Sequence, residues 1–197
     1  MNVDVNPVVG SAAIDIIPPD IAHVGIVGAG QMGSGIAHVC ALAGLSVTLV
    51  DVKQEALVKG LAVIERNMGR QVKRSVISSD DRDVALTRIS TSTDYATFAD
   101  VDLVIEAATE KEDIKRAIFK ALTPSLKPSC LLASNTSSIS ITRLGASTDR
   151  AEKFIGMHFM NPVPVMKLVE VIRGIATDEP TFQAVVLCNL RARFCTA

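Results

Sequence analysis

The stretch Gly25-Ile-Val-Gly-Ala-Gly-Gln-Met-Gly-Ser-Gly35 decides the fold class of this 197-residue chain. Gly28, Gly30 and Gly33 form a GxGxxG pattern between an apolar strand pattern, residues 23–27, and an amphipathic helical pattern. In such a turn the first glycine allows the tight bend, the second lets the backbone approach a pyrophosphate, and the third lets the helix pack on the strand. The pattern and its flanks therefore predict a phosphate-binding turn at a helix N-terminus.

A second strand pattern rich in β-branched residues, 46–50, follows the helix and ends on Asp51. Asp51 stands 23 residues after Gly28, where a carboxylate can accept hydrogen bonds from an adenosine ribose. Because the same carboxylate repels a 2′-phosphate, the sequence favours NAD over NADP. We also assign Gln31 and Met32, inside the glycine-rich turn, to the cofactor site. An ordinary glycine turn is the alternative, but it does not account for strand, helix, strand and acid in this order.

The composition excludes several classes of protein. The net charge is −1 and no segment is strongly basic, which argues against nucleic acid as the main partner. The mean hydropathy is +0.34, as expected of parallel strands covered on both faces. No uninterrupted apolar stretch approaches the ~18 residues of a membrane span, so we expect no membrane partner. Residues 1–20 contain three aspartates and no Lys or Arg, which indicates a short disordered leader rather than a targeting peptide.

The four cysteines carry no metal-binding pattern. Cys40, Cys130, Cys188 and Cys195 form no CxxC pair and have no histidine at metal-ligand spacing. We therefore predict reduced thiols that mostly fill the core, no metal site, and a cytoplasmic location.

Strand and helix patterns alternate along residues 21–197, which predicts an α/β fold: a Rossmann-type, mostly parallel sheet with helices on both faces. Gly44 is expected to end the first helix. The further strands are expected at 88–92, 101–107, 130–134, 153–160 and 168–172, with a last helix from about Asp178.

Two helices are predicted from apolar spacing. The helix after Asp51 is expected to bury Leu57, Leu61, Ile64, Met68 and Val72. A second helix is expected to open with a T-x-x-E capping box, Thr109–Glu112. Its expected buried stripe is Ile114, Ala117, Ile118, Ala121 and Leu122.

Polar residues gather where the predicted strands end. In open α/β sheets, ligands bind outside the carboxyl ends of the strands. His158, after one such strand, is the natural proton-transfer group, because imidazole titrates near neutral pH. Glu170 follows 12 residues later, and its carboxylate could hydrogen-bond the ring if the two strands pair through a turn at 162–164. A core histidine satisfied by a neighbour is the alternative. The strand-end residues are Gly28–Gly33, Asp51, Glu106–Glu110, Ser134–Ser138 and His158–Asn161.

Four sequence blocks resemble the NAD-binding domain of 3-hydroxyacyl-CoA dehydrogenases, especially the bacterial 3-hydroxybutyryl-CoA type. They are Gly25 to Gly44, Val104-Ile-Glu-Ala-Ala-Thr-Glu110, Ala133-Ser-Asn-Thr-Ser-Ser138 and Gly156-Met-His-Phe-Met-Asn-Pro-Val-Pro-Val-Met166. The blocks keep the order and spacing of the family, and the resemblance extends from about residue 21 to about residue 186. It implies a reversible reaction in which an (S)-3-hydroxyacyl-CoA and NAD give a 3-oxoacyl-CoA and NADH.

The resemblance also implies roles for individual residues. His158 would be the general base, Glu170 would orient it, and Ser137 would hydrogen-bond the substrate oxygen near the nicotinamide. The residues implied to contact the cofactor are Glu110, Lys115, Asn135, Ser137 and Asn161.

A basic helix face after Asp51 is a candidate for coenzyme A. In the family, this helical region contacts the phosphates and pantetheine of coenzyme A. The resemblance thus suggests Arg66, Arg70, Lys73 and Arg74, with Lys73 first. The alternative is a basic face that is only solvated.

The C-terminal end departs from the family. Full-length relatives continue into a second, helical domain that supplies a catalytic Asn and most of the homodimer interface. Residues 187–197 no longer resemble the family, and we expect an irregular ending from about residue 187 in a truncated chain. Two further readings stay open: another β-hydroxyacid dehydrogenase, or a non-catalytic NAD-binding fragment.

Overall fold

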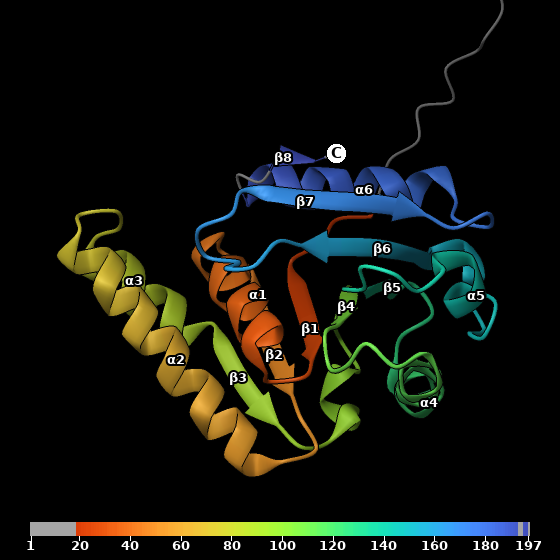
Figure 1. Cartoon of the computed structure of the whole chain (residues 1–197), viewed down its shortest axis with the longest axis horizontal. Helices are drawn as coiled ribbons and strands as arrows, with labels where there is room; N and C mark the ends of the chain where they lie inside the picture. Colours follow the sequence, from red (N-terminus) through yellow and green to blue (C-terminus); the bar gives the residue numbers. More distant parts are fainter. Residues whose placement is uncertain (1–18, 193–194, 197) are drawn as a thin grey trace, which may run out of the picture.

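The computed structural model describes residues 19–192 and 195–196. The predicted leader, residues 1–20, therefore lies outside the described residues except for its last two positions. Within the described residues, one eight-stranded sheet has the order β3-β2-β1-β4-β5-β6-β7-β8 (Figure 1). The strands are β1 His23–Val27, β2 Ser46–Val50, β3 Ile89–Ser92, β4 Leu103–Glu106, β5 Leu131–Ser134, β6 Phe154–Phe159, β7 Leu168–Arg173 and β8 Cys195–Thr196.

The sheet is parallel from β1 to β6, and β7 pairs antiparallel with β6. This is the predicted Rossmann-type arrangement with one antiparallel addition. The helices that connect the strands are α1 Gln31–Leu42, α2 Gln54–Lys73, α3 Ser79–Thr87, α4 Glu112–Leu122, α5 Ile141–Gly145 and α6 Glu179–Arg191. Three short 3₁₀ helices are η1 Tyr95–Phe98, η2 Thr123–Ser125 and η3 Ala151–Lys153.

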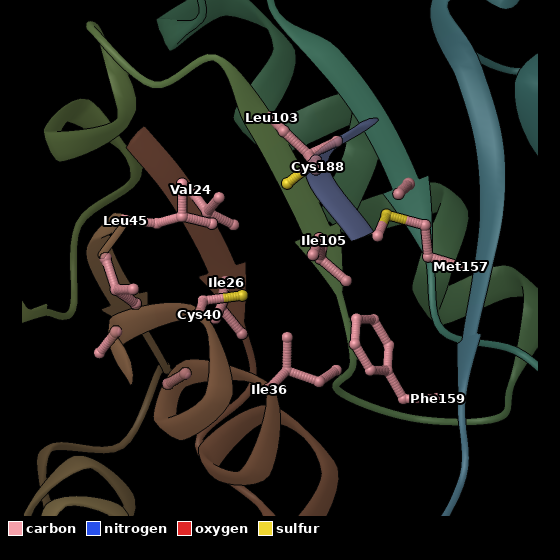
Figure 2. Close-up of a cluster of buried hydrophobic side chains, with 14 of the residues drawn as sticks. Val24, Ile26, Ile36, Cys40, Leu45, Leu103, Ile105, Met157, Phe159 and Cys188 are labelled. Carbon is pink, nitrogen blue, oxygen red and sulfur yellow. The ribbon is translucent and has the colours of Figure 1, made fainter. Parts of the chain in front are cut away.

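Two apolar cores, one on each face of the sheet, hold the layers together. Side chains alternate between the faces along each strand. In β4, Leu103 and Ile105 pack in the core shared with α1, α2, α3 and α6, whereas Val104 packs in the core shared with η1, α4 and α5. Figure 2 shows the first core, where strand residues face Ile36 and Cys40 of α1. The strand residues labelled there are Val24, Ile26, Leu103, Ile105, Met157 and Phe159.

The helix α2 buries Leu57, Ile64 and Met68, as its apolar spacing predicts. Leu61 and Val72, the other two predicted positions, are only partly buried. Gly44 follows the end of α1 with a positive φ of 91°, which confirms its predicted role as a helix stop.

The predicted buried face of α4 is correct at Leu122 and in part at Ile118, which packs partly buried against the second core, but it is wrong at the other three positions. The buried residues are Lys115, Phe119 and Leu122, whereas Ile114 is 45% exposed. Ala117 and Ala121 of the predicted stripe are exposed as well. The helix is rotated because a lysine occupies an interior position through an ion pair with Glu106, and because the ring of Phe119 packs edge-on at 4.9 Å from that of Phe154. A polar side chain with a buried partner thus overrides the apolar pattern.

The predicted capping box at Thr109–Glu112 is also wrong. Helix α4 begins at Glu112 after Lys111, and no side chain of the described residues caps it. The capping box of this protein lies instead at Ser78 and Asp81, at the start of α3.

The predicted irregular ending is wrong for residues 187–191. Helix α6 continues to Arg191, because Ala184, Val185 and Cys188 keep the three- and four-residue spacing of a buried helix face. β8 then pairs parallel with β7 through Leu168–Cys195 and Val169–Thr196.

Cys40, Cys130 and Cys188 are buried, and in the described part of the chain they form no disulfide, as predicted. The side chain of Cys195 lies outside the described part. Across the described ranges, no helix has the length and apolarity that a membrane crossing requires.

The corrected face of α4 leads to a stability prediction. Phe119→Ala should lower the free energy of unfolding by about 3–5 kcal/mol, because it empties a site in the second core. Ile114→Ala on the same helix should change it by about 0.5 kcal/mol or less, because Ile114 is largely on the surface. Urea unfolding followed by circular dichroism measures both values. Equal losses for the two variants would contradict the observed orientation of α4.

Candidate active site

The glycine-rich turn joins β1 to α1 at the carboxyl end of the sheet. Gly28 has a φ of 100°, a left-handed conformation that favours glycine, and its N–H donates to the carbonyl of Val50 at 2.7 Å. A Cβ on Gly33 would lie 1.8 Å from the Gly28 carbonyl oxygen, so the third glycine is required for the helix to approach the turn. These two contacts confirm the sterically demanding turn predicted from the sequence.

The N-terminus of α1 is open toward a ligand. Gly30 is the N-cap residue, and no side chain of the described residues caps the helix there. A Cβ on Gly30 would meet nothing within 4 Å. The first N–H groups of α1 are thus left for an anion, and the helix dipole favours a negative charge at this place. The turn therefore fits the pyrophosphate of a dinucleotide.

Asp51, at the end of β2, is bound to the same turn. One carboxylate oxygen, Oδ2, accepts the N–H of Ala29 at 2.8 Å, and Oδ1 accepts the N–H of Lys53 at 3.0 Å. Each oxygen has a second lone pair, so the carboxylate can hold the turn and still accept a ribose hydroxyl. Its charge at this position supports the preference for NAD over NADP.

A cavity of about 440 Å³ lies beside the turn and collects residues from four strand ends. It brings together eight of the predicted site residues, which come from segments far apart in the sequence. These are Gly30, Gln31, Met32, Glu110, Asn135, Ser137, His158 and Asn161. A larger hollow of about 630 Å³, between the end of α1, α3 and residues 163–167, contains none of the predicted site residues.

His158 and Glu170 form the predicted pair. They lie opposite each other in the antiparallel register of β6 and β7, so their side chains project from the same face of the sheet. Nδ1 of His158 lies 2.7 Å from Oε2 of Glu170. Because the carboxylate engages Nδ1, the nitrogen that remains for a ligand is Nε2. His158 lines the cavity, which supports a role in proton transfer over that of a core histidine.

Glu110 holds the loop after β5. Its Oε1 accepts hydrogen bonds from Thr136 Oγ1 at 2.6 Å, from the Ser137 N–H at 3.0 Å and from Ser138 Oγ at 3.0 Å. Partial burial alone would raise the pKa of Glu110, but these donors and the nearby charge of Lys115 outweigh it, so the pKa lies below its usual value. The carboxylate that positions Ser137 is therefore ionised at neutral pH.

Two amides close the site. Asn161 Oδ1 accepts from Gln31 Nε2 at 3.0 Å, which connects the glycine-rich turn to the end of β6. Asn135 Oδ1 accepts the N–H of Phe159 at 2.9 Å, which ties the loop after β5 to β6. Sequence spacing gave no signal for either contact, because the partners are 130 and 24 residues apart.

Lys115 does not lie where the sequence comparison implies. Its side chain is completely buried and donates to Oε2 of Glu106 at 2.5 Å, so in this conformation it cannot touch a cofactor directly. Glu106 also accepts from Ser134 Oγ at 2.9 Å. The sequence analysis did not predict this buried ion pair. The features that indicate it are a carboxylate at the end of an apolar strand, Glu106, and a lysine four residues before Phe119 on the buried face of α4.

None of the basic residues predicted to bind coenzyme A lines the cavity that contains His158. Arg66, Arg70, Lys73 and Arg74 are exposed, and no ion pair involving them occurs among the described residues. A cavity of about 350 Å³ between α1, α2 and residues 161–164 shares Gly30, Gln31 and Asn161 with the first cavity. The structure thus leaves both readings of the basic face open.

The lowered pKa of Glu110 leads to a pH prediction. A carboxylate with a depressed pKa in the folded state adds stability above its unfolded pKa, and this contribution is lost as the pH falls through the folded value. We expect the Glu110 carboxyl signal in an NMR titration to have its midpoint below 4.5, the ordinary value. Thr136→Val should move the midpoint upward, because it removes a donor to Oε1. A midpoint at or above 4.5 in the unmodified chain would contradict the observed hydrogen bonds.

Comparison with known proteins agrees with this geometry. The family described as 3-hydroxyacyl-CoA dehydrogenase, NAD binding domain, matches residues 23–191. A 3-hydroxybutyryl-CoA dehydrogenase of Bradyrhizobium diazoefficiens is 57% identical over 164 residues, which are 83% of this chain and 56% of that protein. A probable 3-hydroxybutyryl-CoA dehydrogenase of Deinococcus radiodurans is 50% identical over 161 residues, 82% of this chain and 58% of that protein.

A solved structure is similar as well. The crystal structure of (S)-3-hydroxybutyryl-CoA dehydrogenase from Ralstonia eutropha superposes with a TM-score of 0.88 at 47% sequence identity, and the match covers 90% of this chain and 62% of that one. The chain thus spans little more than half the length of the curated relatives described here. By sequence, fold and site, the chain belongs to the 3-hydroxyacyl-CoA dehydrogenase family and corresponds to its NAD-binding domain.

Proposed function

We propose that this chain binds NAD and contributes the proton-transfer site for the reversible oxidation of an (S)-3-hydroxyacyl-CoA to a 3-oxoacyl-CoA. 3-Hydroxybutyryl-CoA is the proposed substrate, because the two relatives and the solved structure described above are named for it. The observation that carries the proposal is the His158–Glu170 pair, which faces a cavity that also contains the N-terminal turn of α1.

The proposed chemistry needs little from the protein beyond orientation and one base. NAD, when bound, supplies the hydride acceptor. Nε2 of His158 takes the proton of the 3-hydroxyl group, and Glu170 on Nδ1 sets the tautomer and stabilises the charged ring. Ser137 turns its hydroxyl, which donates to Glu110 at 3.3 Å in the structure, toward the substrate oxygen, while Glu110 keeps the Ser137 backbone N–H at the cavity.

The residues present fit the proposed cofactor along its length. The open N-terminus of α1 takes the pyrophosphate, and Asp51 takes the adenosine ribose. Asn161 and Glu110 line the cavity where the nicotinamide end belongs. Lys115 does not contact the nicotinamide end directly; it is buried in an ion pair with Glu106 and acts on this end through its neighbour Glu110.

Coenzyme A is the proposed ligand of the basic face of α2. The exposed side chains of Arg70 and Lys73 suit its phosphates. A cytoplasmic location belongs to the same proposal and is supported by the buried thiols of Cys40, Cys130 and Cys188. Homodimer formation, known from the family, remains a proposal for a protein that contains this domain.

A second candidate function is NAD binding without turnover. It is favoured by one observation, namely that the open N-terminus of α1 and Asp51 suffice to hold a dinucleotide without any part played by His158. The two functions differ in one measurable step, the transfer of hydride to a 3-oxoacyl-CoA.

Variants of the catalytic pair test the proposed step. In single-turnover reduction of acetoacetyl-CoA by bound NADH, His158→Gln should slow the reaction by about 10²–10⁴-fold, because it removes the proton-transfer group. Glu170→Gln should slow it less, since the base remains. His23→Gln, at the amino end of the interior strand β1, is the matched control and should leave the rate unchanged. NADH binding without any reduction by the unmodified chain would favour the non-catalytic function.

Charge reversal on α2 tests the proposed coenzyme A face. Lys73→Glu should weaken the binding of coenzyme A, measured by calorimetry, by about tenfold, which corresponds to about 1.4 kcal/mol. The difference should shrink at high salt, because exposed charges are screened. Lys120→Glu on α4 is the matched control of equal charge change. Equal affinity of the Lys73 variant and the unmodified chain would remove Lys73 from the site.

A further inference from the structure

The buried ion pair of Glu106 and Lys115 takes no part in the proposed chemistry. It lies next to Glu110, which lines the proposed cofactor cavity. Both side chains are completely buried, and Lys115 Nζ lies 2.5 Å from Glu106 Oε2. The same carboxylate accepts from Ser134 Oγ at 2.9 Å and, through Oε1, from the Ala108 N–H at 2.8 Å. One carboxylate thus connects the ends of β4 and β5 with the interior of α4.

Stability alone is a weak reason for this pair. Two charges taken out of water lose solvation that their attraction only partly returns, and apolar residues of similar volume are often at least as stabilising. The neighbouring strand and helix positions carry Val104, Phe119 and Leu122. Apolar side chains in place of Glu106 and Lys115 would therefore extend the same apolar core. The pair therefore calls for a role that an apolar contact cannot perform.

Lys115 has a second carboxylate within reach. Its Nζ lies 3.8 Å from Oε2 of Glu110, whose side chain is 43% exposed. The other oxygen of Glu110, Oε1, accepts from Thr136, Ser137 and Ser138. A chain of polar contacts consequently leads from the buried pair to the loop that follows β5.

The position of Ser137 depends on this series of polar contacts. In the described structure both of its hydrogen bonds, from the backbone N–H at 3.0 Å and from Oγ at 3.3 Å, go to Glu110. The strand pairing of β5 with β6 stops at Ser134, before the loop begins. Sheet hydrogen bonds therefore do not hold Ser137 at the cavity, and Glu110 does.

We propose that Lys115 is a positioning residue, anchored by Glu106, that fixes Glu110 and through it places Ser137 at the cavity. The proposal rests on the proposed function in one respect, because it takes Ser137 as the residue that meets substrate and cofactor. An apolar residue at position 115 could fill the same volume, but it could not attract the Glu110 carboxylate.

The experiment compares a single variant with a charge-balanced double variant. Lys115→Met leaves the Glu106 carboxylate buried without its cationic partner and should lower the melting temperature by about 10 °C. The double variant Glu106→Gln with Lys115→Met removes both charges. The glutamine oxygen still accepts from the Ala108 N–H, and its NH2 group donates to Ser134 Oγ, which then acts as the acceptor. The double variant should melt within about 2 °C of the unmodified chain.

Local order separates a positioning role from a merely structural one. In both variants the amide hydrogens of Ser137 and Ser138 should exchange about tenfold faster or more, because their acceptor Glu110 is released. Amides of β1 should keep their protection in the double variant. Glu110→Ala, at a half-exposed position, gives the exchange rate for complete loss of the acceptor.

Cofactor binding is the second measurement. The chain contains no Trp, so NADH fluorescence reports binding without energy transfer from an indole. The double variant should bind NADH about tenfold more weakly, a difference of about 1.4 kcal/mol. Lys127→Met, which breaks the Lys127–Asp102 ion pair near the opposite end of β4, is the matched control and should change neither exchange at Ser137 nor NADH affinity.

The two measurements decide different questions. Normal exchange at Ser137 and Ser138 in the double variant would overturn the positioning role, because restored charge balance would then suffice. Failure of the unmodified chain to bind NADH would overturn the proposed function, whereas the exchange rates would still decide whether Lys115 holds the loop. Accelerated exchange with weakened NADH binding supports both.

Discussion

The parallel register of β1, β2, β4, β5 and β6 is the constraint on which the site depends. In such a register every strand ends at the same edge, so residues far apart in sequence become neighbours. Glu106 pairs in register with Ser134, and Ser134 with Gly156, two positions before His158. The alternation of side chains then directs Glu106, Ser134 and His158 to one face. Three residues from three strands thus reach one region without any local signal that connects them.

The antiparallel addition of β7 has a different effect. It places Glu170 directly opposite His158, at a distance that fixes the ring through Nδ1. A parallel strand would need a long crossover connection to occupy this position, whereas a short turn suffices for an antiparallel one. The one reversal of direction in the β1–β7 part of the sheet therefore brings the Glu170 carboxylate within hydrogen-bond distance of the His158 ring.

Apolar spacing predicts the buried face of a helix only where no charged side chain is buried. The apolar spacing of α2 correctly indicated Leu57, Ile64 and Met68, because no buried position of this helix carries a charged side chain. The same reasoning failed for α4, where Lys115 occupies the interior and Ile114 lies on the surface. A hydrophobicity pattern assumes that charged side chains avoid the core, and an ion pair with Glu106 removes that assumption. The false capping box at Thr109 arose from the same segment, since the start of α4 is set by the turn around Glu110 rather than by a local cap.

The sequence by itself determined the α/β class, the glycine-rich turn and the acid at the end of β2. It indicated a contact of Glu170 with His158 only on the condition that their strands pair, which the register of β6 and β7 supplies. The first three features depend on residue type and short spacing, and steric requirements at Gly28 and Gly33 leave few alternatives. Only the tertiary structure decided which face of α4 is buried, that Lys115 pairs with Glu106 and lies near Glu110, and that Glu110 accepts the N–H of Ser137. Those contacts join residues that become neighbours through the packing of strands, helix and loop, and side chains that meet only in the folded chain leave no periodic trace in the sequence.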